Sequence, residues 1–181
     1  MIIVKKKSLN LKINILTTTA ATGAIYAVLT IILSPISYGP IQARLSEVLC
    51  VLPFFLPETA WGLAVGCAIA NLMTGNIFDV IFGSLATLAA GLAAAAIGKR
   101  GKESLKNKIL ACLMPVLFNS LIISAVILCA YNGKNILDHF GMYLLYALEI
   151  GAGEALVMFA GGLPMMKIIP RLKIFQNTFD F

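Results

Sequence analysis

The sequence predicts an all-α integral membrane protein: a bundle of six transmembrane helices forming one domain over residues 1–181. Hydrophobic residues make up 60% of the chain and charged residues only 12%, whereas soluble proteins average about 45–50% and about 25%. Apolar runs of roughly the 20 residues that a helix needs to cross a bilayer recur along the chain. The basic residues lie between and beyond these runs, which is the arrangement of a membrane protein with charged loops.

Three basic clusters predict the orientation. Twelve of the fourteen Lys and Arg residues fall in residues 5–12, 99–108 and 167–173. Under the positive-inside rule these clusters lie in the cytoplasm, so both termini are expected there and an even number of helices should separate the first two clusters. A nucleic-acid-binding protein would not place its basic residues in short loops between such apolar runs.

The expected helices follow in order. Four apolar runs are long enough to span, at about residues 13–33, 77–97, 109–130 and 140–161. The segment between the first two is too long for one helix, and the orientation requires either no crossing or two crossings within it. Because proline ends or kinks a helix, Pro53 and Pro57 predict two short helices, at residues 44–56 and 59–74. Helices this short are tolerated beside protein or a water-filled cavity; a re-entrant hairpin is the alternative.

Polar side chains inside the expected helices are the candidate binding residues. A carboxylate at bilayer depth costs about 2.5–3.5 kcal/mol, so such residues usually face a cavity and serve a function. The alternative is a carboxylate that is paired within the bundle or reaches the membrane surface. We expect a site in the outer half of the membrane, with Asn119 and Glu149 as its floor. The candidate substrate-binding residues are Arg44, Glu47, Asn71, Asp79, Asn119, Tyr146, Glu149 and Glu154.

The chemistry of this set leaves the ligand open. Carboxylates accept hydrogen bonds from adjacent N–H donors, and a side-chain amide can both donate and accept. An aromatic side chain, for which Tyr143 and Tyr146 are candidates, would stack on a flat ligand. A small planar heterocycle therefore suits the set, but a polyamine or an ion suits it as well.

The expected first helix carries small residues at four-residue spacing, Ala20/Ala24 and Gly23/Ala27. Such a face lets another helix approach closely in lipid. It would contact either a partner protein or a neighbouring helix of the same bundle.

No catalytic, metal-binding or cofactor-binding residue is expected in this chain. The sequence holds no GxxxxGK[ST] loop for ATP, no HExxH pair and no GxSxG motif. Its four cysteines lie in apolar segments without CxxC spacing, so neither a metal site nor a disulfide is expected. Besides a transporter subunit, the residues leave two other classes open: a stand-alone secondary transporter or channel, and a membrane enzyme.

Residues 13–165, most strongly residues 41–91, resemble the QueT family, the substrate-binding (S) components of energy-coupling factor (ECF) transporters assigned to queuosine precursors. The resemblance rests on four motifs: RxxE at 44–47, LPFFxPE at 52–58, GxxxGxxxAN at 62–71 and DxxFGSLAT at 79–87. It implies the six-helix S-component fold in a bacterial cell membrane, with both termini cytoplasmic. It also implies a deazaguanine base as the ligand and no nucleic acid.

The resemblance further implies partners and a mechanism. The partners would be a transmembrane coupling protein and two cytoplasmic ATPase subunits, which bind the ATP. The loop at residues 34–43 would close over the ligand, and Glu47 or Glu149 would accept hydrogen bonds from the edge of the ligand that carries its N–H donors. ATP hydrolysis would then rotate the whole subunit. Ala20, Gly23, Ala24 and Ala27 would form the face for the coupling protein, and the turn at 53–57 with Glu58 would touch partners from inside.

Overall fold

The computed structural model describes residues 2–37 and 44–172, and every regular element in these ranges is helical, which confirms the all-α class. The elements are α1 (Ile2–Ile32), α2 (Ser34–Ser37), η1 (Leu45–Val51), α3 (Leu52–Phe55), α4 (Thr59–Asn71), η2 (Leu72–Thr74), η3 (Asp79–Gly83), α5 (Ser84–Gly98), α6 (Leu105–Val126), η4 (Ile127–Tyr131), α7 (Phe140–Val157), η5 (Met158–Gly162), α8 (Leu163–Ile168) and η6 (Ile169–Arg171).

Four helical segments in the described ranges are long and apolar enough to cross a membrane: Leu11–Ile32, Asp79–Gly98, Leu105–Tyr131 and Phe140–Arg171. Two shorter apolar segments, Leu45–Phe55 and Thr59–Thr74, lie between the first two. The short pair is divided by the turn that contains Pro57. Whether all six segments cross the membrane, and on which side the termini lie, stays a prediction.

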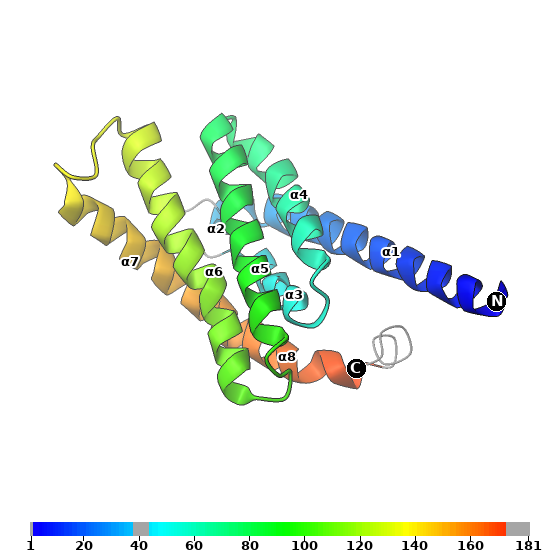
Figure 1. The fold of residues 1–181 in the computed structure, drawn as a ribbon. Coiled ribbons are helices and arrows are strands. Elements are labelled where there is room, and N and C mark those ends of the chain that lie inside the picture. Colours follow the sequence, from blue (N-terminus) through cyan, green and yellow to red (C-terminus); the bar gives the residue numbers. More distant parts are fainter. Residues whose placement is uncertain (1, 38–43, 173–181) are drawn as a thin grey trace.

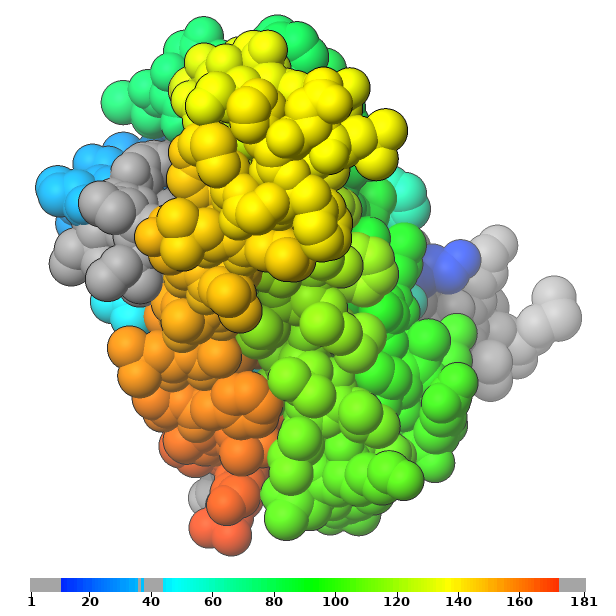
Figure 2. Space-filling view, turned by 90° about the vertical axis from the view of Figure 1, so that its left-hand side faces the viewer, coloured from blue at the N-terminus to red at the C-terminus, as the bar shows by residue number. Residues whose placement is uncertain are grey.

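The helices form a bundle from which α1 projects (Figure 1). The helices pack in a series: α1 contacts α4, α4 contacts α5, α5 contacts α6, and α6 contacts α7. Figure 2 shows α6 and α7 side by side on one face of the molecule. We call the end with the turns at 75–78 and 132–139 the upper end, and the end with the basic loop at 99–104 the lower end.

The short segment formed by η1 and α3 lies at the centre of the bundle. It contacts α1, α4, α5, α6 and α7, and Val51, Phe54 and Phe55 belong to the main hydrophobic core together with Ala94 and Met166. A helix too short to span is stable here because protein, and not lipid, surrounds its ends. Pro53 lies in the first turn of α3, where its missing N–H costs no hydrogen bond.

Glycines bring α1 and α4 into backbone contact. A Cβ atom at Gly62 would lie 2.1 Å from the carbonyl oxygen of Thr19, and one at Gly66 would lie 2.2 Å from that of Gly23. At Gly23 it would lie 2.3 Å from the oxygen of Gly62. The helices can approach this closely only because both lack side chains at the contact.

The small-residue face of α1 therefore divides in two. Gly23 and Ala27 are buried inside the protein, whereas Ala20 and Ala24 are exposed. Ala20, Ala24 and the floor residue Gly23 border a groove between α1 and α4, whereas Ala27 does not line it.

Candidate ligand-binding site

Glu47 lies at the centre of the bundle, in η1, and its side chain is fully buried. The Tyr26 hydroxyl donates to one of its carboxylate oxygens over 2.5 Å, and the Cys50 thiol donates to the other over 2.9 Å. Tyr26 itself comes from α1 and is fully buried. A buried carboxylate is tolerated when its oxygens are hydrogen-bonded, so these donors fix Glu47 in place.

Arg44 and Asn71 meet beside Glu47 at the thiol of Cys67. Arg44 is 6% exposed and donates from Nη1 to Sγ of Cys67 over 3.9 Å. Asn71 is fully buried and donates from Nδ2 to the same sulfur over 3.4 Å and to the carbonyl oxygen of Asp79 over 2.8 Å. A Cβ atom at Gly83 would lie 2.4 Å from this amide, so the glycine makes room for it. The contacts tie α4 to η3 and hold the start of η1.

Glu154 of α7 is a second buried carboxylate, with 2% exposure. The Asn119 amide on α6 donates to its Oε1 over 3.0 Å, and its Oε2 has no hydrogen-bond partner among the described residues. Both Arg44 and Glu47 interact electrostatically with it. The second carboxylate thus lies within electrostatic reach of the first and of the Arg44 guanidinium.

A cavity of about 410 Å³ opens at the upper end, next to this cluster. Arg44 and Asp79 supply its charged groups, and the Tyr131 hydroxyl donates to Oδ2 of Asp79. Ligand sites of proteins typically measure about 300–1,000 Å³ and combine an apolar lining with a few polar groups. The cavity has both features; it is lined by Arg44, Met73, Thr74, Asp79, Ile123, Ile127 and Tyr131.

A family model described as QueT transporter matches residues 16–171. The chain belongs to the QueT transporter family. It is thus a multi-pass membrane protein of a transporter family, and a transporter lies in a lipid bilayer and binds a small-molecule ligand.

A curated relative comes from Lactococcus lactis subsp. cremoris (strain MG1363) and is named "Queuosine precursor transporter QueT". It is 44% identical over 73 residues, which are 39% of this chain and 43% of the relative. The match thus covers less than half of that relative's length. No solved structure matches this one.

The structure brings four of the expected binding residues of this QueT-family chain to one region. Arg44, Glu47 and Asn71 are buried, and Asp79 is half-buried at the cavity beside them. These residues come from three elements or their ends, η1, α4 and η3, and the hydrogen bonds to Cys67 join Arg44 and Asn71. That a ligand contacts any of them stays a prediction.

Two other expected residues lie away from this region. Glu149 is exposed, whereas Glu154, five residues later on the same helix, is buried. At about 100° per residue the two side chains point roughly 140° apart, so α7 can turn only one of them inward. The Tyr146 hydroxyl accepts a hydrogen bond from Asn132 over 3.1 Å at the exposed loop.

The remaining expectations concern loops. The loop expected to close over the ligand, residues 34–43, includes 38–43, which lie outside the described residues. Ser34–Ser37 form α2 at the end of α1. Glu58 is exposed in the turn before α4.

Sequence reasoning missed Tyr26, Cys50, Cys67 and Tyr131. Cys67 had a usable signal, because it lies four residues before Asn71 and one helical turn places the two on the same face. Tyr26 and Tyr131 had no such signal. An aromatic residue in an apolar run is equally consistent with a core residue and with an anchor at the membrane surface.

Proposed function

We propose that this chain is the substrate-binding subunit (S component) of an ATP-driven ECF uptake transporter, and that its ligand is a queuosine precursor, a deazaguanine base. It performs no catalysis itself. The observation that carries the proposal is a cavity with Arg44 and Asp79 on its walls, beside buried Glu47, in a chain of the QueT transporter family. The name of the Lactococcus relative, a queuosine precursor transporter, supports the choice of ligand.

The cavity suits the edge of a guanine-type base. Such an edge presents a carbonyl acceptor next to N–H donors. A guanidinium such as that of Arg44 has only donors, a carboxylate such as that of Asp79 offers acceptors, and both line the same cavity. A guanidinium and a carboxylate on the walls of one cavity therefore complement this edge, and charged partners strengthen each hydrogen bond.

The upper end is proposed to face outside. The basic loop at 99–104 lies at the lower end (Figure 1), and basic loops of membrane proteins stay in the cytoplasm. The cavity is at the upper end, so a ligand would enter it from outside the cell.

The proposed surface for the coupling protein is the groove between α1 and α4. Its volume is about 390 Å³, and its walls are apolar or small, including the exposed Ala20 and Ala24. Small residues let a helix from another chain approach closely, and exposed Trp61, Val65 and Ile69 extend the apolar surface along α4. Since the sequence holds no P-loop, ATP would be hydrolysed by the partner subunits.

Uptake by reconstituted liposomes tests this proposal. Vesicles would contain the chain alone, or the chain with the coupling protein and ATPases, and uptake of a labelled deazaguanine would be followed with ATP inside or outside. We expect binding without accumulation for the chain alone, and accumulation only with the partners and ATP. ATPases altered at the P-loop lysine are the control.

Two results would overturn the proposal. Accumulation by the chain alone under an ion gradient would identify a stand-alone secondary transporter. Release of a chemically altered ligand would identify an enzyme.

A further inference from the structure

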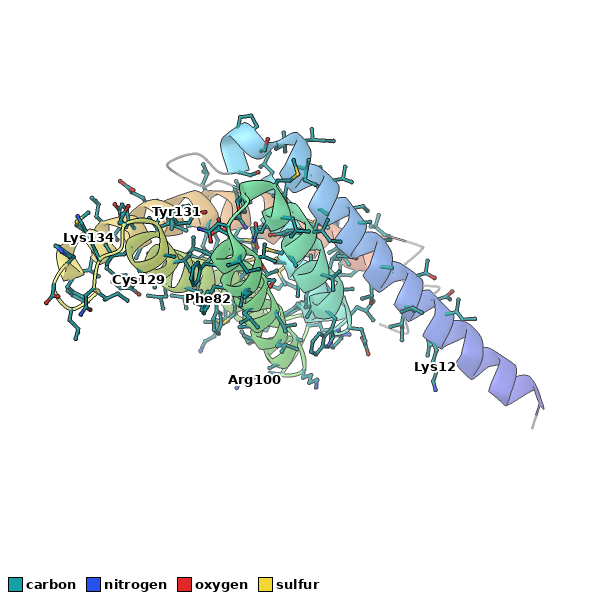
Figure 3. The ribbon with its side chains drawn as sticks, turned by 90° about the horizontal axis from the view of Figure 1, so that it is seen from above. Lys12, Phe82, Arg100, Cys129, Tyr131 and Lys134 are labelled. Carbon is teal, nitrogen blue, oxygen red and sulfur yellow. The ribbon has the colours of Figure 1, made fainter. Side chains whose placement is uncertain are left out.

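Tyr131 lies at the candidate ligand cavity. It ends η4, is 51% exposed, and lines the cavity together with Arg44 and Asp79. In Figure 3, which views the molecule from above, Tyr131 lies on one side of the α5–α6 pair, while Cys129 and Phe82 lie on the other. The latter two line a separate apolar groove.

The widened turn of η4 brings Tyr131 to the cavity. Ile123, Ile127 and Tyr131 follow at four-residue intervals, and all three line the cavity. In a regular α-helix, residues four apart drift by about 40° around the axis. Residues 127–131 form a π-helical turn, closed by a hydrogen bond from Asn132 N to Ile127 O of 3.1 Å. A π-helical turn holds more residues than an α-helical turn, so it offsets this drift and keeps Tyr131 on the side of Ile123 and Ile127. Such turns often occur at functional sites.

The hydroxyl of Tyr131 also holds the cavity's carboxylate. It donates to Oδ2 of Asp79, across 52 residues of sequence. The other oxygen, Oδ1, accepts no hydrogen bond from the described residues. Asp79 therefore has one oxygen engaged by the phenol and one left for a ligand.

Resting on the proposed function, we propose that Tyr131 is a ligand-contacting residue that determines specificity. Its ring forms the flat wall on which the base stacks, and its hydroxyl orients Asp79 so that the carboxylate meets the N–H donors of a guanine-type edge. Stacking of a base on an aromatic side chain contributes about 1–3 kcal/mol. An anchor at the membrane surface, the usual role of tyrosine there, would not touch the ligand.

The test compares two bases on the purified full chain. 7-Deazaguanine and 7-deazahypoxanthine share the ring system, but the second lacks the amino group, whose N–H lies beside the ring N–H on the recognised edge. Equilibrium binding would be measured for the wild type, Tyr131→Phe and Tyr131→Leu. Tyr143→Leu is the matched control, because its hydroxyl donates to the carbonyl oxygen of Leu121 and it does not line the cavity.

We expect the two substitutions to separate ring from hydroxyl. Tyr131→Phe keeps the ring, so it should retain binding but reduce the preference for deazaguanine by about three- to tenfold, the value of one hydrogen bond. Tyr131→Leu should weaken the binding of both bases by about five- to 100-fold. Tyr143→Leu should change neither affinity.

Three results would overturn the inference. If the wild type binds deazaguanine and both Tyr131 variants match it, Tyr131 does not contact the ligand, while the proposed function stands. Should Tyr131→Leu fail to fold, an unchanged preference in Tyr131→Phe still refutes the specificity role. If the folded wild type binds neither base, the proposed function fails, and this assignment fails with it.

Discussion

Glu47 shows how single residues sustain a charge inside this protein. Its two carboxylate oxygens are hydrogen-bonded to Tyr26 and Cys50, which come from different elements. Glu154 is equally buried, but only one of its oxygens is paired. Unpaired buried polar groups are costly, so an additional hydrogen-bond donor at the second carboxylate would stabilise the protein.

Replacing Glu47 by Gln should weaken deazaguanine binding by about ten- to 100-fold, because the hydrogen bonds from Tyr26 and Cys50 to the charged carboxylate, worth about 1.5–3 kcal/mol, hold η1 in place beside Arg44. The amide also places a donor where Cys50 now donates. Isothermal titration of the purified chain would measure the effect. Glu149→Gln removes the same charge from an exposed position and should leave the affinity within about twofold of wild type. Equal effects of both substitutions would contradict a special role for Glu47.

Replacing Asn119 by Leu should lower the free energy of unfolding by about 1–3 kcal/mol, because Glu154 would lose the donor to Oε1. Thermal unfolding in detergent would show a lower midpoint. Asn132→Leu is the control, since Asn132 is exposed and its substitution should cost no more than about 0.5 kcal/mol. An unchanged midpoint for Asn119→Leu would mean that Glu154 is satisfied in another way.

At the scale of elements, α1 and α4 are locked together and share two tasks. Toward the bundle interior they carry Tyr26, Cys67 and Asn71 of the buried cluster. Toward the outside they border the groove with Ala20 and Ala24. The proposed ligand site and the proposed partner surface therefore lie on opposite sides of one rigid helix pair.

Gly62→Ala should destabilise the protein strongly, because the new methyl group would lie 2.1 Å from the carbonyl oxygen of Thr19 and force the helices apart. Overpacking of this kind typically costs about 1–3 kcal/mol. Gly141→Ala is the matched control: it is also helical, but nothing lies within 4 Å of the new atom. Thermal unfolding should show a loss for the first only, and a loss shared by both would disprove the close contact.

Ala24→Trp should prevent assembly with the coupling protein without changing ligand affinity, because the bulky ring would fill the groove between α1 and α4. Co-purification of the partners and deazaguanine binding would be measured on the same preparation. Val28→Trp is the control, since Val28 is exposed on α1 but does not line the groove. Normal assembly of the Ala24 variant would place the partner surface elsewhere.

At the scale of the whole molecule, hydropathy and proline placement predicted the helical class and the division of the short pair. This was possible because bilayer thickness sets the length of an apolar run and proline ends a helix, and both features can be recognised in a sequence. The basic clusters predict an orientation that is still untested. The family motifs predicted membership in the QueT family, which the match over residues 16–171 confirms.

The rotation of each helix could not be predicted in the same way. In a soluble helix the polar face marks the outside, but in lipid both faces of α7 are apolar, so the sequence could not show which of Glu149 and Glu154 faces inward. The sequence likewise could not decide whether the small residues on α1 contact a neighbouring helix or a partner protein. Gly23 is buried and Ala24 is exposed, although both are small residues of the same helix. Contacts between distant segments, such as Tyr131 with Asp79, depend on tertiary packing and leave no local pattern.

Titration of the purified chain with 7-deazaguanine, in detergent and without any partner protein, tests the central claim most directly. We predict saturable one-to-one binding in the micromolar range or tighter, lost when Arg44 and Asp79 are both replaced by alanine. A folded wild-type chain that shows no saturable binding of this base, or binding that survives the double substitution, would contradict it.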